Sequence, residues 1–269
     1  MLSYSAFETP APGPDDLDLP VVIRMLGTFA LIKNGMPLPV RSGGKTEALL
    51  SALALRCYRR IPRSVLLGEV WPEADPDLSI QALNSLVHSL RRLLSDALGG
   101  EPPVTCTQGA YQLNLGAGVG VDYARFDELA NEGDLEARVA PEGAITSYER
   151  ALSLYDGDLC AGDQHAAVVE RERLRARYLT LLVRCAFHYY ERRDIEQALR
   201  LALRLLEHDP YREDAHRLVM RCHVIRGERA QALRQYRICG QMLRAEFDAA
   251  PEADTIALYD LIRLEPGSI

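Results

Sequence analysis

The stretch QALNSLVHSLRRLL, residues 81–94, combines a leucine pattern with polar side chains that could hydrogen-bond to a partner surface. At helical spacing its apolar residues form one stripe that would face a core. This stripe comprises Leu83, Val87, Leu90 and Leu94, with Leu86 and Leu93 widening it. The opposite side carries short polar groups and then two cations: Gln81, Asn84, Ser85, His88, Ser89, Arg91 and Arg92.

The polar side lacks negative charge, because no Asp or Glu lies between Asp77 and Asp96. Such a surface can approach phosphate groups without repulsion. Asn, Gln, Ser and His side chains can also donate to and accept from base edges in a major groove. The helix alone therefore leaves two interpretations open: a core helix with a solvated polar side, or a helix whose polar side reads DNA.

Three predicted strands and two predicted helices precede this helix in the sequence. Three strand-like runs lie within residues 21–40, and Asn34-Gly35 between the last two is a strong hairpin signal. A helical pattern then begins near Lys45, and a short second helix lies between Pro62 and Trp71. The polar-sided helix itself should begin around Asp77 and stop at Gly99-Gly100.

Two β-like runs, VTCTQ and YQLNL, follow this helix, and we expect a turn through Gly109-Ala110 to join them. A sheet, three helices and a β-hairpin, in that order, predict a winged helix-turn-helix module over residues 20–115. Thr107 and Gln108 would then lie near the tip of a wing that can reach DNA, whereas Tyr111 should pack against the helices.

A basic cluster of Arg59, Arg60 and Arg63 surrounds the turn before the second helix. Contacts to the DNA backbone are one interpretation of this cluster, and a solvated turn is the other. Residues 20–115 carry ten Lys/Arg against seven Asp/Glu, whereas residues 1–19 and 116–269 are both acidic. A basic segment inside a chain of net charge −7 is typical of a DNA-binding module attached to another domain.

The glycine-rich stretch GAGVG indicates a linker at residues 116–121, beyond which nearly everything has a helical pattern. Within the predicted all-helical domain, residues 122–269, the tetrapeptide QALR occurs at 197–200 and again at 231–234. This displacement of 34 residues is the period of tetratricopeptide (TPR) helix pairs. The fold class expected is therefore mainly α, with a small α+β N-terminal domain followed by a TPR-like domain.

Composition places the chain among soluble cytoplasmic proteins. Residues 1–19 are acidic and proline-rich, which predicts a disordered leader and not a signal peptide. No apolar run approaches the ~20 residues that a membrane span needs. The six cysteines are scattered without a CxxC pair, as expected of free thiols in a reducing compartment.

The sequence contains no motif that indicates catalysis or cofactor binding. GGKT at residues 43–46 resembles part of a P-loop, but Pro39 stands where that loop needs its first glycine. The six histidines have no metal-ligand spacing, and no serine-based catalytic motif is present. We therefore expect no enzyme activity, no cofactor and no metal.

Three segments together resemble the Streptomyces antibiotic regulatory protein family (SARPs): VIRMLGTFALIKNGMPLPV, then LLGEVWPEADPDLSIQALNSLVHSLRRLL, then TQGAYQLNL…VDYARFDEL. The helical region that follows is similar to the family's bacterial transcriptional activator domain. The resemblance spans about residues 21–264 and implies an OmpR-like winged helix, a TPR-like domain, and a short-form member without the ATPase region of larger relatives. It also implies a pathway-specific activator of antibiotic or secondary-metabolite genes.

The family resemblance further implies binding to direct repeats in double-stranded promoter DNA, self-association on DNA, and contact with RNA polymerase holoenzyme through its sigma factor and alpha subunit. Two departures concern the helix at residues 81–94, where the family commonly reads ALQTHVSRLRR. Ser89 stands in place of the usual arginine, and Leu86 replaces a polar residue. An arginine-to-guanine contact would then be absent, with His88 or Asn84 compensating or a different site preferred. Near the end, the usual ELGxEP appears only as AEFDAAPEA.

We therefore expect a DNA-binding activator in which Asn84, Ser85, His88 and Ser89 approach bases while Arg91 and Arg92 contact phosphate. The alternative hypothesis is a TPR-type interaction scaffold whose winged helix is vestigial or binds protein. Binding of promoter DNA by residues 20–115 alone would discriminate between the two.

Overall fold

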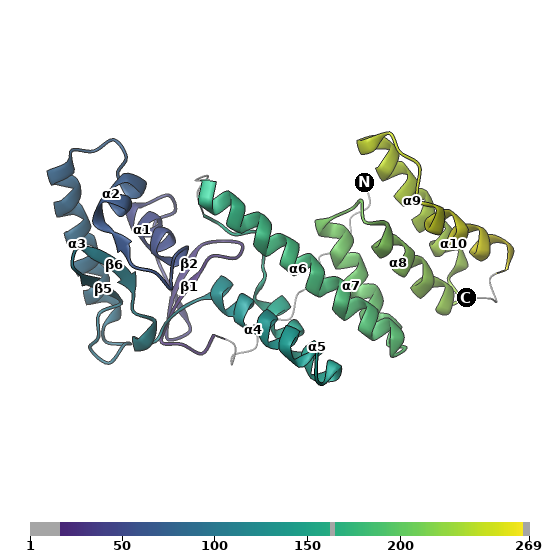
Figure 1. The fold of residues 1–269 in the computed structure, drawn as a ribbon, viewed down its shortest axis with the longest axis horizontal. Coiled ribbons are helices and arrows are strands. Elements are labelled where there is room, and N and C mark those ends of the chain that lie inside the picture. Colours follow the sequence, from purple (N-terminus) through teal and green to yellow (C-terminus); the bar gives the residue numbers. More distant parts are fainter. Residues whose placement is uncertain (1–16, 162–164, 266–269) are drawn as a thin grey trace. The chain divides into compact units, whose positions relative to one another are not determined.

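The computed structural model describes residues 17–161 and 165–265 and forms two compact units that divide between Arg175 and Ala176 (Figure 1). Most of the predicted disordered leader, residues 1–16, lies outside the described residues. The winged helix-turn-helix lies in the first unit, and the repeated helices lie in the second. The predicted fold class, a small α+β region followed by helices, is confirmed.

The first unit opens with a four-stranded sheet in the order β3-β2-β1-β7. Strands β1 (Val21–Arg24), β2 (Ala30–Lys33) and β3 (Met36–Leu38) are antiparallel neighbours. Asn34 and Gly35 connect β2 to β3 with φ values of 48° and 75°, as a two-residue hairpin turn requires. The predicted hairpin is confirmed.

The segment predicted as a linker, residues 116–121, has regular secondary structure. The segment contains a short 3-10 turn, η1 (Leu115–Ala117), and then strand β7 (Val119–Val121), which pairs in parallel with β1. Both valines of β7 are buried, and Gly120 lies so close to Leu19 that a Cβ would meet its side chain at 2.4 Å. The glycines therefore allow close packing here, not flexibility. The assignment of separate roles to residues 20–115 and 122–269 stays a prediction.

Three helices and a second sheet complete the winged helix. The helices are α1 (Lys45–Ala54), α2 (Arg63–Val70) and α3 (Pro76–Leu94), and a three-stranded sheet has the order β4-β6-β5. Its strands are β4 (Ile61–Pro62), β5 (Val104–Thr107) and β6 (Ala110–Leu113). Helix α3 ends at Leu94, and Gly99 and Gly100, both with positive φ, lie in the turns that follow it.

Three further helices follow β7: α4 (Asp122–Glu136), α5 (Pro141–Leu154) and α6 (His165–Glu191). At the start of α4, the buried Asp122 carboxylate accepts hydrogen bonds of 2.8 Å from the backbone N–H groups of Met25 and Leu26. Helices α4 and α5 pack closely because Gly133 has no side chain, and a Cβ there would lie 2.4 Å from the Tyr148 ring.

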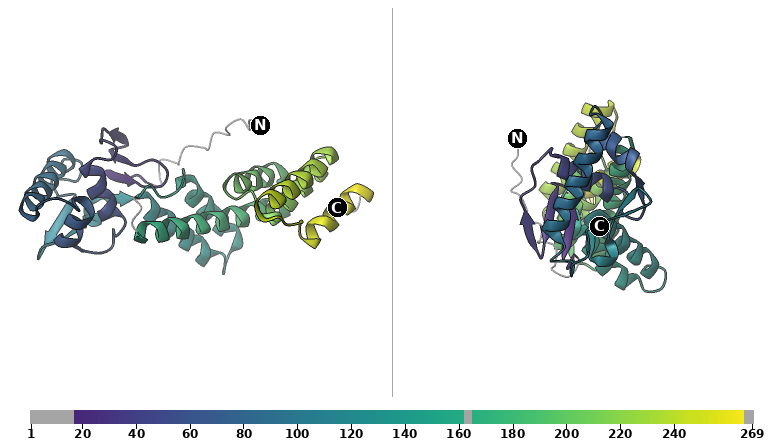
Figure 2. Two further views of the ribbon diagram at one scale, coloured as in Figure 1. Left: turned by 90° about the horizontal axis from the view of Figure 1, so that it is seen from above. Right: turned by 90° about the vertical axis from the view of Figure 1, so that its left-hand side faces the viewer.

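The second unit continues with α7 (Ile195–His208), α8 (Glu213–Ile225), α9 (Arg229–Phe247) and α10 (Ala253–Leu264). Helices α7, α8 and α9 lie side by side in sequence order (Figure 1, Figure 2). Ala198 and Ala232, equivalent residues of the two QALR repeats, are both fully buried. Small residues at equivalent positions allow each helix to approach its neighbour, as the TPR-like pattern predicts.

Candidate nucleic-acid interface

Helix α3 has one buried and one exposed side. Leu83, Leu90 and Leu94 are buried and anchor it to the core of the first unit. Leu86 and Val87 are half-buried, in keeping with the predicted stripe. Leu93 does not extend this stripe, because its side chain is 42% exposed at the C-terminal end of the helix.

The polar residues predicted to face DNA are exposed on α3, which is labelled in Figure 1. They are Asn84, Ser85, His88, Ser89, Arg91 and Arg92. Among the described residues, neither Arg91 nor Arg92 takes part in an ion pair. Both guanidinium groups can therefore bind an external anion.

The acidic residue after this helix is neutralised by a contact from the four-stranded sheet. Lys33 Nζ donates to Asp96 Oδ2 at 2.8 Å and to the Leu93 carbonyl at 2.9 Å. The hydrogen bond from Lys33 lowers the pKa of the Asp96 carboxyl group below its ordinary value. Lys33 thus ties β2 to the end of α3 and supplies a positive charge beside its last turn.

The β5–β6 hairpin forms the predicted wing. Its turn residues are Gln108 and Gly109, with φ values of 53° and 76°, so the predicted turn through Gly109-Ala110 is displaced by one residue. Ala110 instead pairs with Thr107 and with Pro62. Thr107 and Gln108 are exposed at the tip, and the Arg63 backbone N–H donates to the Gly109 carbonyl at 3.0 Å.

The three arginines before and at the start of α2 have different environments. Arg59 and Arg60 are exposed, whereas Arg63 is half-buried as the first residue of α2. The Nε atom of Arg63 is buried and has no hydrogen-bond partner among the described residues. Its backbone N–H bond to the Gly109 carbonyl makes Arg63 part of the contact between α2 and the wing.

Tyr111, expected to pack against the helices, is 3% exposed on β6. Its hydroxyl donates a 3.4 Å hydrogen bond to Asn84 Oδ1 on α3. Burial raises the pKa of the Tyr111 hydroxyl above its ordinary value. Sequence reasoning did not predict this link between wing and helix, although a buried tyrosine hydroxyl signals that some partner must exist.

His216 in the second unit has a structural role and no sign of a catalytic one. His216 is buried, with its Nε2 2.9 Å from the Pro210 carbonyl and its Nδ1 2.8 Å from Gln235 Nε2, and burial lowers its pKa. Within the described ranges, no group of three or more His, Cys, Asp or Glu residues could hold a metal ion. A search of those same ranges finds no helix with the length and apolar character needed to cross a bilayer.

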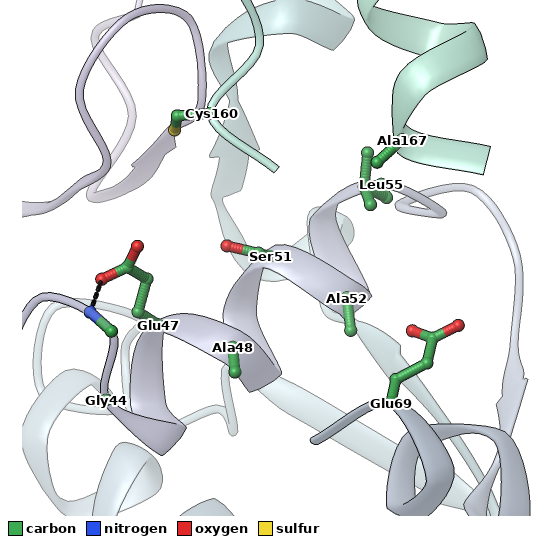
Figure 3. A pocket seen from close by; sticks show the side chains of 10 residues that line it. Gly44, Glu47, Ala48, Ser51, Ala52, Leu55, Glu69, Cys160 and Ala167 are labelled. Carbon is green, nitrogen blue, oxygen red and sulfur yellow. Dashed lines mark hydrogen bonds between the residues drawn. The ribbon is translucent and has the colours of Figure 1, made fainter. Parts of the chain in front are cut away.

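A cavity of about 230 Å³ lies beside α1, lined by residues of α1, by Glu69 of α2, and by Cys160 and Ala167 (Figure 3). Its two carboxylates already have partners within the chain. Glu47 accepts a 2.9 Å hydrogen bond from the Gly43 backbone N–H, and Glu69 forms a two-point ion pair with Arg56. Neither carboxylate is therefore an open binding group, and the exposed side of α3 with the adjacent wing is the main candidate site.

Comparison with known proteins gives one family match. Residues 121–263 match the model of the bacterial transcriptional activator domain. The match covers more than half of the 269-residue chain.

Proteins similar to the chain include two curated relatives and a solved structure. Transcriptional regulator RedD of Streptomyces coelicolor is 25% identical over 238 residues, which cover 87% of this chain and 67% of RedD. Regulatory protein DnrI of Streptomyces peucetius is 27% identical over 157 residues, 54% of this chain and 55% of DnrI. Mycobacterium tuberculosis EmbR, solved in complex with a low-affinity phosphopeptide, has a similar fold. Its TM-score is 0.70 at 21% identity, and the match covers 91% of this chain and 65% of the EmbR chain.

Proposed function

The chain belongs to the bacterial transcriptional activator domain family, as a SARP-type regulator, and on that premise we propose that it activates transcription by binding specific DNA sequences. The main support is the exposed side of α3. Its polar groups, together with two arginines that form no ion pair within residues 17–161 and 165–265, make a surface without carboxylates between Asp77 and Asp96. The wing lies beside this helix, as a winged helix requires for contact with a groove and the flanking backbone.

The residues of this surface divide into two roles. Asn84, Ser85, His88 and Ser89 have side chains of the size and polarity that reach base edges in a major groove. Arg91 and Arg92 at the C-terminal end of α3 bind phosphate, as do Arg59 and Arg60 before α2. Thr107 and Gln108 at the wing tip contact the DNA backbone or the minor groove. Arg63 holds the wing against α2 and also supplies a positive charge near the DNA.

The partners and the target genes follow from the resemblance to SARPs and are part of the proposal. They are double-stranded promoter DNA with direct repeats, a second copy of the chain on that DNA, and RNA polymerase holoenzyme through its sigma factor and alpha subunit. The regulated genes belong to antibiotic or other secondary-metabolite biosynthesis. The protein acts in the cytoplasm, without enzymatic activity of its own.

Footprinting tests the proposal directly. The full chain, with and without RNA polymerase, is incubated with promoters adjacent to its own gene, and we expect protection of a directly repeated sequence. Absence of any protected site, together with specific capture of a protein by the helical region, would favour the interaction-scaffold hypothesis. The half-buried position of Leu86 weakens that hypothesis, because packing explains the departure from the family pattern.

A substitution at Arg92 tests the phosphate contacts. Because each phosphate contact contributes about one unit to the slope of log affinity against log salt, Arg92→Ala should lower that slope by about one. The exposed Arg138, beyond the end of α4, provides the matched control, since Arg138→Ala should leave the slope unchanged. An unaltered slope and affinity for Arg92→Ala would exclude its contact with phosphate.

A further inference from the structure

We propose that the second unit also binds DNA, through a basic stripe on the exposed side of α9 that contacts the phosphate backbone independently of sequence. The basic stripe consists of Arg234, Arg237, Gln241 and Arg244. This second contact rests on the proposed DNA-binding function and lies outside the winged helix.

Helix α9 is strongly basic within an acidic part of the chain. Residues 229–245 contain four arginines and no Asp or Glu, whereas residues 116–269 as a whole are acidic. Helix α3 has the same pattern of cations without carboxylates over several turns. Such a surface can approach phosphate groups without repulsion.

The periodicity of α9 places the basic stripe on the side away from its neighbours. The buried side of the helix comprises Ala232, Gln235, Cys239 and Leu243. At 3.6 residues per turn, the four residues of the basic stripe lie within about 80° of arc on the opposite side. All four are exposed, so the basic stripe faces away from the helix's packing contacts.

The arginines of the basic stripe are available to a partner. Within residues 17–161 and 165–265, none of them forms an ion pair or a side-chain hydrogen bond. Arg229, at the start of the same helix, is instead engaged with α10, because its Nε donates to the Ile262 carbonyl at 3.0 Å. Glu246, the first carboxylate after the basic stripe, accepts a 3.2 Å hydrogen bond from the Tyr211 hydroxyl.

The composition of the basic stripe favours nucleic acid over a protein partner. Protein–protein interfaces have an apolar core, whereas protein–DNA interfaces are more polar and more positively charged. The exposed large apolar residues of α9, Met242 and Phe247, both lie outside the arc of the basic stripe. Guanidinium groups also suit phosphate, because they bind it with two parallel hydrogen bonds.

The length of the basic stripe matches several phosphates. From Arg234 to Arg244 the helix rises by about 15 Å. One strand of B-DNA presents a phosphate about every 3.4 Å along the helix axis. Each of the three arginines can therefore meet a separate phosphate.

Salt titration of the full chain tests the contact. One variant combines Arg234→Gln, Arg237→Gln and Arg244→Gln, and its affinity for a duplex with the footprinted site is measured between about 50 and 200 mM salt. Each phosphate contact contributes about 0.9 to the slope of log affinity against log salt, so the slope should fall by about 2 to 3. Over this range the unsubstituted chain should lose roughly 40-fold more affinity than the variant. A scrambled duplex of equal length should show the same change, because backbone contacts carry no sequence information.

Two further variants and a melting curve complete the design. Lysine at the same three positions keeps the charge and should restore most of the slope. The matched control removes three arginines of the second unit that are already ion-paired, and it should leave the slope nearly unchanged: Arg212→Gln, Arg226→Gln and Arg263→Gln. Thermal unfolding of the basic-stripe variant should equal that of the unsubstituted chain, because the substituted side chains lie opposite the packed side of α9.

The outcomes separate this contact from recognition by α3. If the basic-stripe variant keeps the slope on both duplexes, or if the matched control loses as much, the contact of α9 with DNA is refuted, and preference for the footprinted site still supports α3. A variant that keeps the slope but no longer binds RNA polymerase would identify a protein partner and would equally refute the contact. If the unsubstituted chain does not distinguish the two duplexes, the proposed sequence-specific function fails, and the slope on the scrambled duplex still decides whether α9 binds DNA.

Discussion

Replacement of Asp122 by asparagine should destabilise the first unit, because this carboxylate accepts three backbone hydrogen bonds inside the protein. Oδ1 accepts from the N–H groups of Met25 and Tyr123, and Oδ2 accepts from Leu26, each at 2.8 Å. In Asp122→Asn one of these oxygens becomes an NH2 group that faces a donor. A buried donor without a partner costs about 1–3 kcal/mol, so two opposed donors should lower the free energy of unfolding by about 2–6 kcal/mol.

The same carboxyl group predicts how stability depends on pH. Burial raises the pKa of Asp122 from its ordinary value of 3.8 to about 6, in spite of the three hydrogen bonds to it. A raised pKa in the folded state means that the folded chain binds the proton more tightly than the unfolded chain. The stabilisation is therefore present at low pH, and about 3 kcal/mol is lost as the pH rises from about 4 to 6. Asparagine does not titrate, so the stability of Asp122→Asn should not fall in this way between about pH 4 and 6.

Denaturant unfolding, followed by the fluorescence of Trp71, measures both effects in the first unit, since Trp71 is the only tryptophan in the chain. The difference in unfolding free energy between the unsubstituted chain and Asp122→Asn should be larger near pH 4.5 than at pH 7. Asp156→Asn provides the control, because Asp156 forms an exposed ion pair with Arg24 that is worth at most about 1 kcal/mol. A loss below about 1 kcal/mol for Asp122→Asn, or a difference independent of pH, would refute the reasoning.

Two other predictions concern helix packing and the charge beside α3. Gly133→Ala should lower the free energy of unfolding by about 1–3 kcal/mol in a thermal unfolding assay, because its Cβ would meet the Tyr148 ring at 2.4 Å. Gly143→Ala is the control and should be close to neutral in the same assay, because the nearest atom to its Cβ would be 4.0 Å away. Lys33→Met should weaken DNA binding at low salt, because the Asp96 carboxylate beside the end of α3 loses its cation. The difference in DNA affinity between Lys33→Met and the unsubstituted chain, measured by fluorescence anisotropy, should shrink as the salt concentration rises. Equal affinities of the two proteins at low salt would contradict the prediction.

Local patterns predicted most of the fold. The turn at Asn34-Gly35 and the leucine spacing of α3 are signals that a few neighbouring residues determine, and both have the expected structure. The exposed positions of Asn84 and Arg92 followed from the same helical periodicity. The 34-residue displacement between the QALR repeats similarly indicated the helix pairs of the second unit, because a repeat is visible without knowledge of its contacts.

Features that depend on long-range contacts were not predictable in the same way. Val119–Val121 pairs with β1 nearly a hundred residues earlier, and glycine-rich composition suggested a linker instead. The acceptor role of Asp122 and the bond between Tyr111 and Asn84 likewise join residues that no local pattern relates. The wing turn was placed one residue late, because Gln108, which is not glycine, takes the first positive φ of the turn.

The pairing of β7 with β1 sets the order in which the chain can fold as it is made. Strand β1 is synthesised about a hundred residues before its parallel partner at residues 119–121 and the Asp122 carboxylate. At synthesis rates of about 5–20 residues per second, this edge of the sheet waits roughly 5–20 s for its partner. The backbone of Val21, Val22 and Ile23 remains open to pairing with another chain during that interval. A fragment that stops at residue 115 would keep this edge open permanently, so a stable winged helix needs residues 116–122 as well.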